Sequence, residues 1–461
     1  MTLLPGELDD SGPTEPTARL VPLRPGRLAR TAAGSFGLLV LSTGFGFVSN
    51  VLLARILGAG GYGLYVFVMA VIGILGVFCV VGLDRLVVRE LAGHVTRGSW
   101  DLASGVVRYA NALGLVASVA VTLLALVAIA VVSGGFESPT AVAFALALPI
   151  LILSTLGRVR STTLQALHHV VIAQVPERVV RPVLLTVLLG VVAMAAPPDL
   201  RTPALAVVVS VAAVGAAFLV GTVLLRLRLP PQLLSATPRY ESRRWLKAAV
   251  PLTLLGIVGA VNQQADVILL GALVGPEEAA VFAVANRSAA LIGFGLAAVN
   301  SWLAPVVSSL WASGDRVELE RTVIRAARLA TVVTAALAVG FVVFSDSLLL
   351  VFGPEFTGGA TALTVLSAGQ VFNALTGSVG VLLVMTGHDR QVLVAAGFGA
   401  VLNVVLNLLL VPQFGATGAA VAHASSMAIW NILLAIAVYR RLGIHSTALG
   451  RIAIGRRPGR T

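Results

Sequence analysis

The sequence predicts an all-α, polytopic membrane protein with about twelve transmembrane helices, arranged in two six-helix lobes related by a parallel pseudo-repeat. Three observations predict it: the composition, the spacing of apolar segments and the placement of positive charges. Of the 461 residues, 57% are hydrophobic and 11% are charged, and the mean hydropathy is +0.97. A soluble domain averages about 25% charged residues. The composition therefore excludes an ordinary soluble domain.

Twelve apolar segments have the length that a bilayer crossing requires, which is about 20 residues. They carry almost no charge and are separated by short loops, as expected for helices that satisfy their backbone hydrogen bonds internally. Pro149 and Pro182 interrupt the pattern in the region of the fourth and fifth segments. The predicted spans are roughly 34–57, 62–84, 103–132, 139–158, 180–197, 203–226, 249–273, 279–303, 323–345, 360–386, 391–411 and 416–438.

Positive charges predict the orientation of these spans. Every Lys and Arg except Arg55, Arg201 and Arg287 lies in the leader, in the tail, or in or beside an even-numbered connection. Lys and Arg accumulate in cytoplasmic loops, so we expect both termini in the cytoplasm. A formal charge of +12 would favour nucleic-acid binding in a soluble protein. Here topology explains the charge, and we expect no nucleic-acid partner.

The chain divides into five predicted parts. Residues 1–33 contain little to bury and are expected to form a disordered cytoplasmic leader. Residues 34–226 form an N-lobe and residues 249–440 a C-lobe, joined by a basic cytoplasmic linker at 227–248. Residues 441–461 form a basic cytoplasmic tail.

Two pairs of segments indicate that the lobes repeat. Gly58 lines up with Gly275 at an offset of 217, and His168 lines up with His388 at an offset of 220. An even number of spans per lobe gives repeats of the same orientation, with a substrate site between them.

Little supports metal, cofactor or enzyme chemistry. Cys79 is the only cysteine, so no intramolecular disulfide forms. The six histidines show no HExxH spacing. A membrane enzyme, such as a sugar polymerase or glycosyltransferase, needs large loops with paired carboxylates or a metal-binding acidic motif, whereas the longest connection holds one acid, Glu241. We expect no metal, no cofactor and no enzymatic activity.

Four motifs, taken in order, resemble those of the polysaccharide exporters. These are the flippases for lipid-linked oligosaccharides, such as O-antigen precursors, within a larger group that also holds the multidrug antiporters. The resemblance covers about residues 34 to 441. Its motifs are Leu53–Tyr65 (LARILGAGGYGLY), Val274–Glu278 (VGPEE) with Phe282–Arg287 (FAVANR), Leu303–Pro305 (LAP), and Met385–His388 (MTGH) with Leu402-Asn403, Leu406-Asn407 and Pro412–Ala420 (PQFGATGAA).

The resemblance implies a two-lobed transporter that works by alternating access. It would move a lipid of the undecaprenyl-diphosphate type, carrying sugars, from the inner to the outer leaflet of a bacterial plasma membrane. The implied partners are the lipid-linked glycan and the bilayer, with the polysaccharide polymerase and glycosyltransferases of the same pathway as candidates.

Charged groups inside the spans are the first candidates for a substrate site, because such groups are costly there and usually face a cavity or a partner. Asp266 and Arg287 lie at similar depth in neighbouring predicted spans. They form either a structural ion pair, or Arg287 joins Arg55 in a cationic wall for the lipid diphosphate, which the planar guanidinium fork suits. Arg55 can instead extend to the outer surface.

Polar amides supply the second set of candidates, because sugar hydroxyls need donors and acceptors. The same side chains can also bridge helices, which is the interpretation favoured for Asn403 and Asn407, and His423 is expected to pack inside the bundle. The complete set of predicted substrate-binding residues is Arg55, Arg287, Asn50, Gln263, Gln264, Asp266, Asn286, Gln370 and Asn373.

Two other transporters of the same fold remain alternatives. A cation-coupled multidrug antiporter needs a buried carboxylate, and the predicted spans of the N-terminal half contain none, so only Asp266 can serve. A flippase for the peptidoglycan lipid precursor typically has two additional helices, for which the chain after residue 441 leaves no room.

Overall fold

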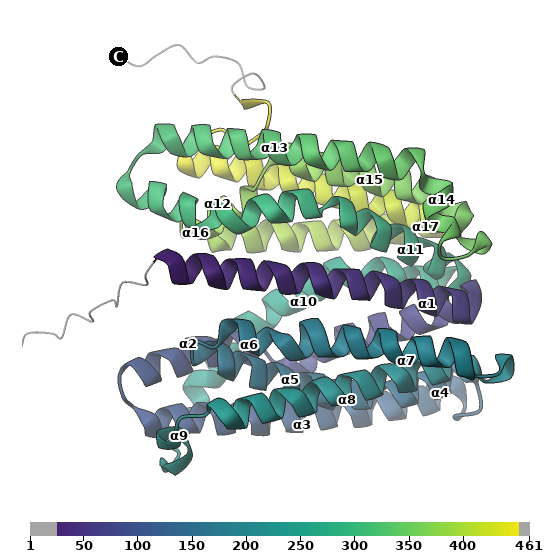
Figure 1. The fold of residues 1–461 in the computed structure, drawn as a ribbon, viewed down its shortest axis with the longest axis horizontal. Coiled ribbons are helices and arrows are strands. Elements are labelled where there is room, and N and C mark those ends of the chain that lie inside the picture. Colours follow the sequence, from purple (N-terminus) through teal and green to yellow (C-terminus); the bar gives the residue numbers. More distant parts are fainter. Residues whose placement is uncertain (1–24, 451–461) are drawn as a thin grey trace, which may run out of the picture.

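A computed structural model describes residues 25–450, with side chains from Gly34 onward, and this part of the chain is helical apart from its connecting loops (Figure 1). Residues 1–24 of the predicted leader and 451–461 of the predicted tail lie outside the described residues. The first helix begins at Pro25, so the last residues assigned to the leader belong to it.

The helices fall into two bundles (Figure 1). The N-terminal bundle contains α1 (Pro25–Val80), α2 (Leu83–Thr96), α3 (Trp100–Ser133), α4 (Pro139–Ala147), α5 (Pro149–Ala166), α6 (Val170–Val175), the π-helix η1 (Pro176–Val180), α7 (Arg181–Ala195), the 3₁₀ turn η2 (Pro198–Leu200), α8 (Pro203–Arg228) and α9 (Pro231–Ser235). The C-terminal bundle contains α10 (Ser242–Leu273), α11 (Pro276–Ile292), α12 (Phe294–Ser313), α13 (Arg316–Val343), α14 (Ser345–Leu350), the 3₁₀ turn η3 (Pro354–Gly359), α15 (Ala360–Thr376), α16 (Val379–Met385) and α17 (Asp389–Leu442).

Two of these helices are hairpins. In α1 the backbone leaves helical geometry at Gly58 (φ 66°, ψ 178°), and the Tyr62 hydroxyl donates to Asn50 Oδ1 at 2.8 Å. In a straight helix these residues would lie about 18 Å apart along the axis, so the arms before and after Gly58 run antiparallel. In α17 the fold lies at Gly415 (φ 53°, ψ −133°), and Asn403 Nδ2 donates to Ser426 Oγ at 3.4 Å.

The number of crossings agrees with the prediction once the hairpins are counted. Within the described residues, 9 helices are long and apolar enough to cross a membrane, or 10 if the bent pair Pro354–Thr376 and Val379–Met385 is one span. Gly34–Thr96 and Asp389–Leu442 are among them, and each supplies two antiparallel arms. The protein is therefore an all-α, multi-pass membrane protein with about twelve crossings, as the sequence predicts.

Corresponding corners of the two bundles show the predicted repeat. Gly58 and Gly275 both have positive φ, at 66° and 135°, and each precedes a helical segment. Gly98 and Gly314 also correspond, because each donates its N–H three residues back and accepts from the residue two places on. These corners lie at offsets of 217 and 216.

The third corner corrects the alignment of His168 with His388. His168 and Gly387 are the residues with left-handed backbone, at φ 64° and 78°. His169 and His388 then each donate an N–H to the carbonyl five residues back, at 2.9 and 2.7 Å. The matching pairs are therefore His168 with Gly387 and His169 with His388, at an offset of 219. The predicted offset of 220 was wrong, because identity of two histidines was taken as equivalence.

The two ends of the molecule have different cores. We call the end with Gly58, Gly275 and Gly353 the sealed end, and the end with Gly98, Gly314 and Gly443 the basic end. A single apolar core at the sealed end joins both lobes, and its members include Leu53 and Tyr62 from α1 with Phe282 and Phe356 from the C-lobe. At the basic end two separate cores occur, one in the N-lobe around α2, α3 and α5 and one in the C-lobe around α12, α13 and α17.

The start of α10 belongs to the N-lobe core. Trp245 is fully buried there, with its ring 5.4 Å from that of Tyr109. Just before α10, Arg239 donates its N–H to the Asp101 carbonyl at 3.1 Å. The segment predicted as a linker, 227–248, thus contains the end of α8, α9 and the first turns of α10, and packs on the N-lobe.

Candidate functional site

Arg55 lies at the sealed end and joins the lobes. Its side chain is exposed, and its Nε and Nη2 donate to the carbonyls of Val351 and Leu350 at 2.7 and 3.3 Å. The two carbonyls belong to the C-terminal end of α14 in the C-lobe, where both residues are exposed. In this conformation Arg55 is therefore exposed at the sealed end and bonded to the C-lobe.

Asp266 and Arg287 do not form the ion pair that was one of the two predicted arrangements. Asp266 is 2% exposed and accepts hydrogen bonds from Asn403 Nδ2 at 2.9 Å, Asn407 Nδ2 at 2.8 Å and His423 Nδ1 at 2.7 Å. Arg287 makes no salt bridge within residues 25–450. The two residues lie on neighbouring helices, but the Asp266 side chain bonds to α17 and does not point toward Arg287.

The fold of α17 explains how three donors reach one carboxylate. Asn403 and Asn407 are one turn apart on the first arm and so share a face, while His423 comes from the second arm. The hairpin at Gly415 presents both arms to α10, which carries Asp266. A buried charge needs such partners. The bridging role predicted for Asn403 and Asn407, and the inward position predicted for His423, agree with this arrangement.

Arg287 is an unpaired cation between the lobes. Its side chain is exposed, although α11 packs against α1, α10, α15 and α17. Of these helices α1 belongs to the N-lobe, so Arg287 lies on a C-lobe helix at the junction of the two lobes. It lies within electrostatic range of Tyr62, on the second arm of α1. In the described residues Arg287 has no hydrogen-bonding partner, so it is available to an anion.

Several predicted amides are already used within the protein. Asn50 donates to the Gly46 carbonyl at 2.6 Å and accepts from Tyr62. Asn373 accepts from Asn431 Nδ2 at 3.0 Å. Both amides therefore stabilise the helix arrangement in this conformation.

The remaining amides are only partly engaged. Gln264 lies against Gly73 of α1, and Gln370 lies against Gly293 at the end of α11. Gln263 is exposed, and Asn286 is partly buried beside Arg287. These four side chains come from α10, α11 and α15 of the C-lobe.

The fifth span contains a charged cluster that was not among the predicted site residues. The helical segment Val170–Ala195 has the length and hydropathy of a membrane span, and it includes Glu177, Arg178 and Arg181. The predicted span began near residue 180, because Arg178 and Arg181 were assigned to the fourth connection. The N-lobe therefore does hold a carboxylate within a span, which removes one reason given against a cation-coupled antiporter.

A π-helical turn carries this cluster. Over Pro176–Val180 the helix widens, and the Arg181 N–H donates to the Pro176 carbonyl five residues back. Such turns occur often at functional sites. Glu177 and Arg181 form a salt bridge at 3.2 Å, with side chains 35% and 40% exposed.

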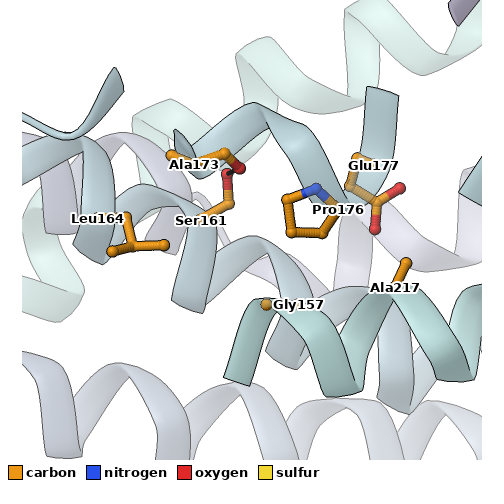
Figure 2. Close-up of a pocket in the computed structure, with 8 residues that line it drawn as sticks. Gly157, Ser161, Leu164, Ala173, Pro176, Glu177 and Ala217 are labelled. Atoms are coloured by element: carbon orange, nitrogen blue, oxygen red, sulfur yellow. Dashed lines mark hydrogen bonds between the residues drawn. The ribbon is translucent and has the colours of Figure 1, made fainter. Parts of the chain in front are cut away.

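A small hollow adjoins the π-helical turn, as Figure 2 shows. It lies between α5, η1 and α8, with Pro176 and Glu177 at one side and Ala217 at another, and Gly157 and Ser161 contribute from α5. Pro176 packs close to Gly221 of α8. The hollow is mostly apolar, and its polar groups are the Glu177 carboxylate and the Ser161 hydroxyl, which donates to the Ala173 carbonyl at 2.8 Å.

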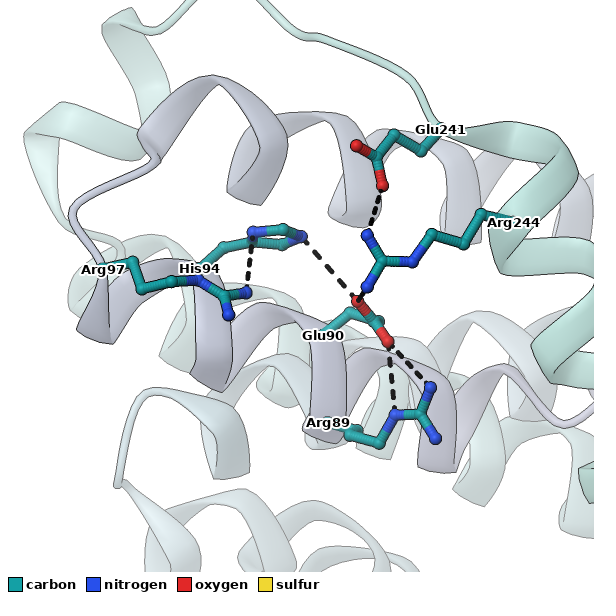
Figure 3. A network of polar contacts seen from close by, with 6 residues as sticks. All are labelled: Arg89, Glu90, His94, Arg97, Glu241 and Arg244. Carbon is teal, nitrogen blue, oxygen red and sulfur yellow. Dashed lines mark hydrogen bonds and ion pairs between the residues drawn. The ribbon is translucent and has the colours of Figure 1, made fainter. Parts of the chain in front are cut away.

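A second polar network, drawn in Figure 3, joins α2 to the start of α10 at the basic end. Glu90 is 6% exposed and contacts Arg89 at 3.0 Å, Arg244 at 3.8 Å and His94 at 3.9 Å. Arg244 also pairs with Glu241 at 2.8 Å. The network links the N-lobe to α10, and we assign it a structural role.

Two repeated helical lobes, sealed together at one end and with a free cation between them, define a polytopic membrane transporter. The chain belongs to the polysaccharide biosynthesis protein family, whose model matches residues 31–311. A second family model, MatE, matches residues 251–409. The family resemblance predicted from the motifs is confirmed.

Two curated relatives come from the archaeon Haloferax volcanii. The probable low-salt glycan biosynthesis flippase Agl15 is 27% identical over 169 residues, and the probable flippase AglR is 28% identical over 172 residues. Each match covers 36% of this chain and 36% of the relative, so the chain matches about a third of the length of either protein.

Solved structures share the fold over most of the chain. An inward-facing multidrug resistance MATE family transporter of the MOP superfamily has a TM-score of 0.72 at 15% identity, covering 89% of this chain and 98% of that one. The lipid II flippase MurJ, in an inward closed conformation, has a TM-score of 0.69 at 15% identity, covering 89% and 87%. At this identity the similarity establishes the two-lobed fold.

Proposed function

We propose that this protein flips a lipid-linked oligosaccharide, of the undecaprenyl-diphosphate type, from the inner to the outer leaflet of a bacterial plasma membrane by alternating access. The observation that carries the proposal is Arg287, an exposed cation on the C-lobe helix that packs against α1 of the N-lobe, with no ion pair or hydrogen bond in the part of the chain that the structure describes. The basic end is then cytoplasmic, because Lys and Arg collect on that side of a membrane.

The two ends of the interface fit a conformation that accepts substrate from the cytoplasm. The sealed end is closed by the core shared between the lobes, and the basic end has a separate core in each lobe. The diphosphate enters from the basic end and meets Arg287, while the isoprenoid tail stays in the surrounding lipid. Rocking of the lobes then opens the sealed end and closes the basic end.

The amides of the C-lobe are placed to meet the sugars. Four of the predicted amides are exposed or partly buried: Gln263, Gln264, Asn286 and Gln370. Asn50 and Asn373, in contrast, are hydrogen-bonded within the protein. Amide groups both donate and accept, which suits hydroxyl groups of many glycans. We propose these four as contacts to the glycan. Glycosyltransferases and a polymerase of the same pathway would supply and consume the lipid-linked glycan.

The experiment compares two arginines in cells that make the polysaccharide. Arg287→Ala is expected to abolish export at normal protein level, because the diphosphate loses its cation. Arg201→Ala is the control, since Arg201 donates to the Ala196 and Ala193 carbonyls within one lobe at 3.1 and 3.0 Å. Normal export by Arg287→Ala would contradict the assignment of the site.

A cation-coupled multidrug antiporter is the second candidate, and the Asp266 cluster favours it. A buried carboxylate bonded to a histidine inside a membrane is typical of sites that take up a proton. Asp266→Asn keeps the size of the side chain and removes its charge. Loss of drug resistance with intact polysaccharide export would favour the antiporter, and the reverse result would favour the flippase.

The third candidate, a peptidoglycan precursor flippase, shares the fold with MurJ. It is separated from the others by depletion of the protein in cells. Arrested cell-wall growth would favour it, whereas loss of surface polysaccharide with continued growth would favour the flippase proposed here.

A further inference from the structure

Arg181 is a second cation near the middle of the molecule, and it comes from the N-lobe. It begins α7, about 21 Å before the end of that helix at Ala195, at 1.5 Å per residue. Arg287 lies about 16 Å from the start of α11 at Pro276 by the same measure. Both helices reach the sealed end, so the two arginines lie at similar depth in opposite lobes.

Tyr65 lies near both cations. It lies on the second arm of α1, and its hydroxyl shares a hydrogen bond of 2.9 Å with Ser210 of α8. Arg181 and Arg287 are both within electrostatic range of this hydroxyl. Arg178, one turn before Arg181, donates to the Ser35 carbonyl of α1 at 3.3 Å. Arg181 therefore lies inside the N-lobe, beside Glu177 and near the second arm of α1, the helix that packs on α11.

Arg181 keeps donors free for an incoming anion. A guanidinium has five N–H donors, and in the described residues Arg181 bonds through Nη1 to Glu177. That carboxylate is partly exposed and one turn away, so another anion can displace it at low cost. Arg160 of α5 differs, because it packs on the ring of Phe218 at 4.1 Å.

The π-helical turn explains how this pair is placed. One additional residue in the turn rotates the following helix by about 100° relative to a regular helix. Arg181 is the first residue after that turn. Its direction is therefore set by Pro176–Val180, and Glu177 stays beside it as counter-ion.

We propose that Arg181 and Arg287 are the two halves of one diphosphate site, one from each lobe, and that Arg181 exchanges Glu177 for a phosphate when the substrate binds. The inference rests on the proposed function and deepens it. Two cations separated across the interface suit two linked phosphates better than one. The site is then complete only while both lobes face the same headgroup.

The test measures binding of two probes to the purified full-length protein in detergent, by calorimetry. The probes are farnesyl diphosphate and farnesyl monophosphate. The wild type is expected to prefer the diphosphate. Arg181→Ala and Arg287→Ala are each expected to weaken diphosphate binding by about tenfold, as loss of a charged hydrogen bond implies, and to reduce the preference over the monophosphate. Glu177→Gln is expected to strengthen diphosphate binding, because Arg181 no longer has a competing carboxylate.

Arg178→Ala is the matched control, since that side chain is already bonded to α1, and it should bind as the wild type does. Diphosphate binding weakened by Arg287→Ala but not by Arg181→Ala would overturn this inference and leave the proposed function standing. Equal weakening by Arg178→Ala would also overturn it, since a general charge effect would suffice. A wild type that binds neither probe would overturn the proposed function itself. If Arg181→Ala fails to fold, Arg181→Lys and Glu177→Gln decide the question, with weaker and stronger binding expected.

Discussion

The sealed end and the basic end of the molecule hold the lobes in different ways. At the sealed end side chains of both lobes share one core, with the rings of Phe47 and Phe352 5.3 Å apart across the interface. At the basic end each lobe has its own core, and α10 crosses from one lobe to the other. The difference shows that the lobes are joined by packing at one end and by a covalent connection at the other.

Under the proposed alternating access, the contacts of the shared core at the sealed end have to break, while the attachment of α10 to the N-lobe has to persist. Opening the sealed end separates apolar side chains that share one core, whereas at the basic end the core of each lobe is already separate. Variants at the two ends should therefore behave differently, and four of them test the comparison.

The largest effect is expected for Trp245→Ala at the basic end. Trp245 is fully buried in the N-lobe core, and removing such a side chain costs about 3 to 5 kcal/mol. The free energy of unfolding should fall by that amount in a denaturant titration, while the sealed end stays closed. Trp302→Ala, at a residue that is 44% exposed, should have little effect. Equal losses in both variants would show that the start of α10 is not anchored as described.

Gly63→Ala should have the next largest effect, at the sealed end. A Cβ on Gly63 would overlap the Pro276 carbonyl oxygen, whereas a Cβ on Gly37, in the other arm of α1, meets no atom within 4 Å. Overpacking costs about 1 to 3 kcal/mol, so Gly63→Ala should destabilise the contact between α1 and α11 and favour separation of the lobes at the sealed end. Labelling of a cysteine introduced as Phe352→Cys reports this opening, since Cys79 is buried. Gly37→Ala should leave the labelling unchanged, and a rise in both variants would contradict the predicted contact.

Arg55→Ala should loosen the sealed end by a smaller amount, about 1 kcal/mol, because exposed hydrogen bonds contribute little. Arg201→Ala removes the same number of bonds to carbonyls, but within one lobe. Labelling at Phe352→Cys should increase in the first variant only, at a similar loss of melting temperature. Unchanged labelling in Arg55→Ala would show that the bonds to Val351 and Leu350 do not hold the lobes together.

Arg244→Ala should have the smallest effect, below about 1 kcal/mol, because its side chain is 63% exposed. Together with Trp245→Ala it separates packing from charge at the basic end. A thermal melt of both single variants measures the difference. A larger loss in Arg244→Ala than in Trp245→Ala would indicate that the ion pairs around Glu90, not the apolar core, anchor α10.

Much of the fold could be predicted because bilayer length, apolar composition and charge placement act over the whole chain. The repeat could be predicted at Gly58 and Gly275, where a positive φ favours glycine. The equivalence at His168 could not be found from identity, because the left-handed position holds His in one lobe and Gly in the other.

The candidate site was predictable in depth but not in direction. Counting residues placed Asp266 and Arg287 at one level, and only packing revealed that Asp266 bonds to α17 while Arg287 is exposed and lies on α11 beside α1 of the N-lobe. Glu177 and Arg181 were missed for a different reason. Proline and charge usually end a span, and here a π-helical turn carries them within it.

The two attachments of α10 have a mechanical consequence. Trp245 fixes its first turns in one lobe, and Asp266 fixes its other half in the second lobe. The proposed alternating access tilts the lobes against each other, which requires α10 to bend between those two points. Pro251 lies in that stretch and lacks a backbone N–H, so we expect the bend to be concentrated there. A bent α10 stores elastic energy, which opposes the movement of the lobes in one direction and favours their return.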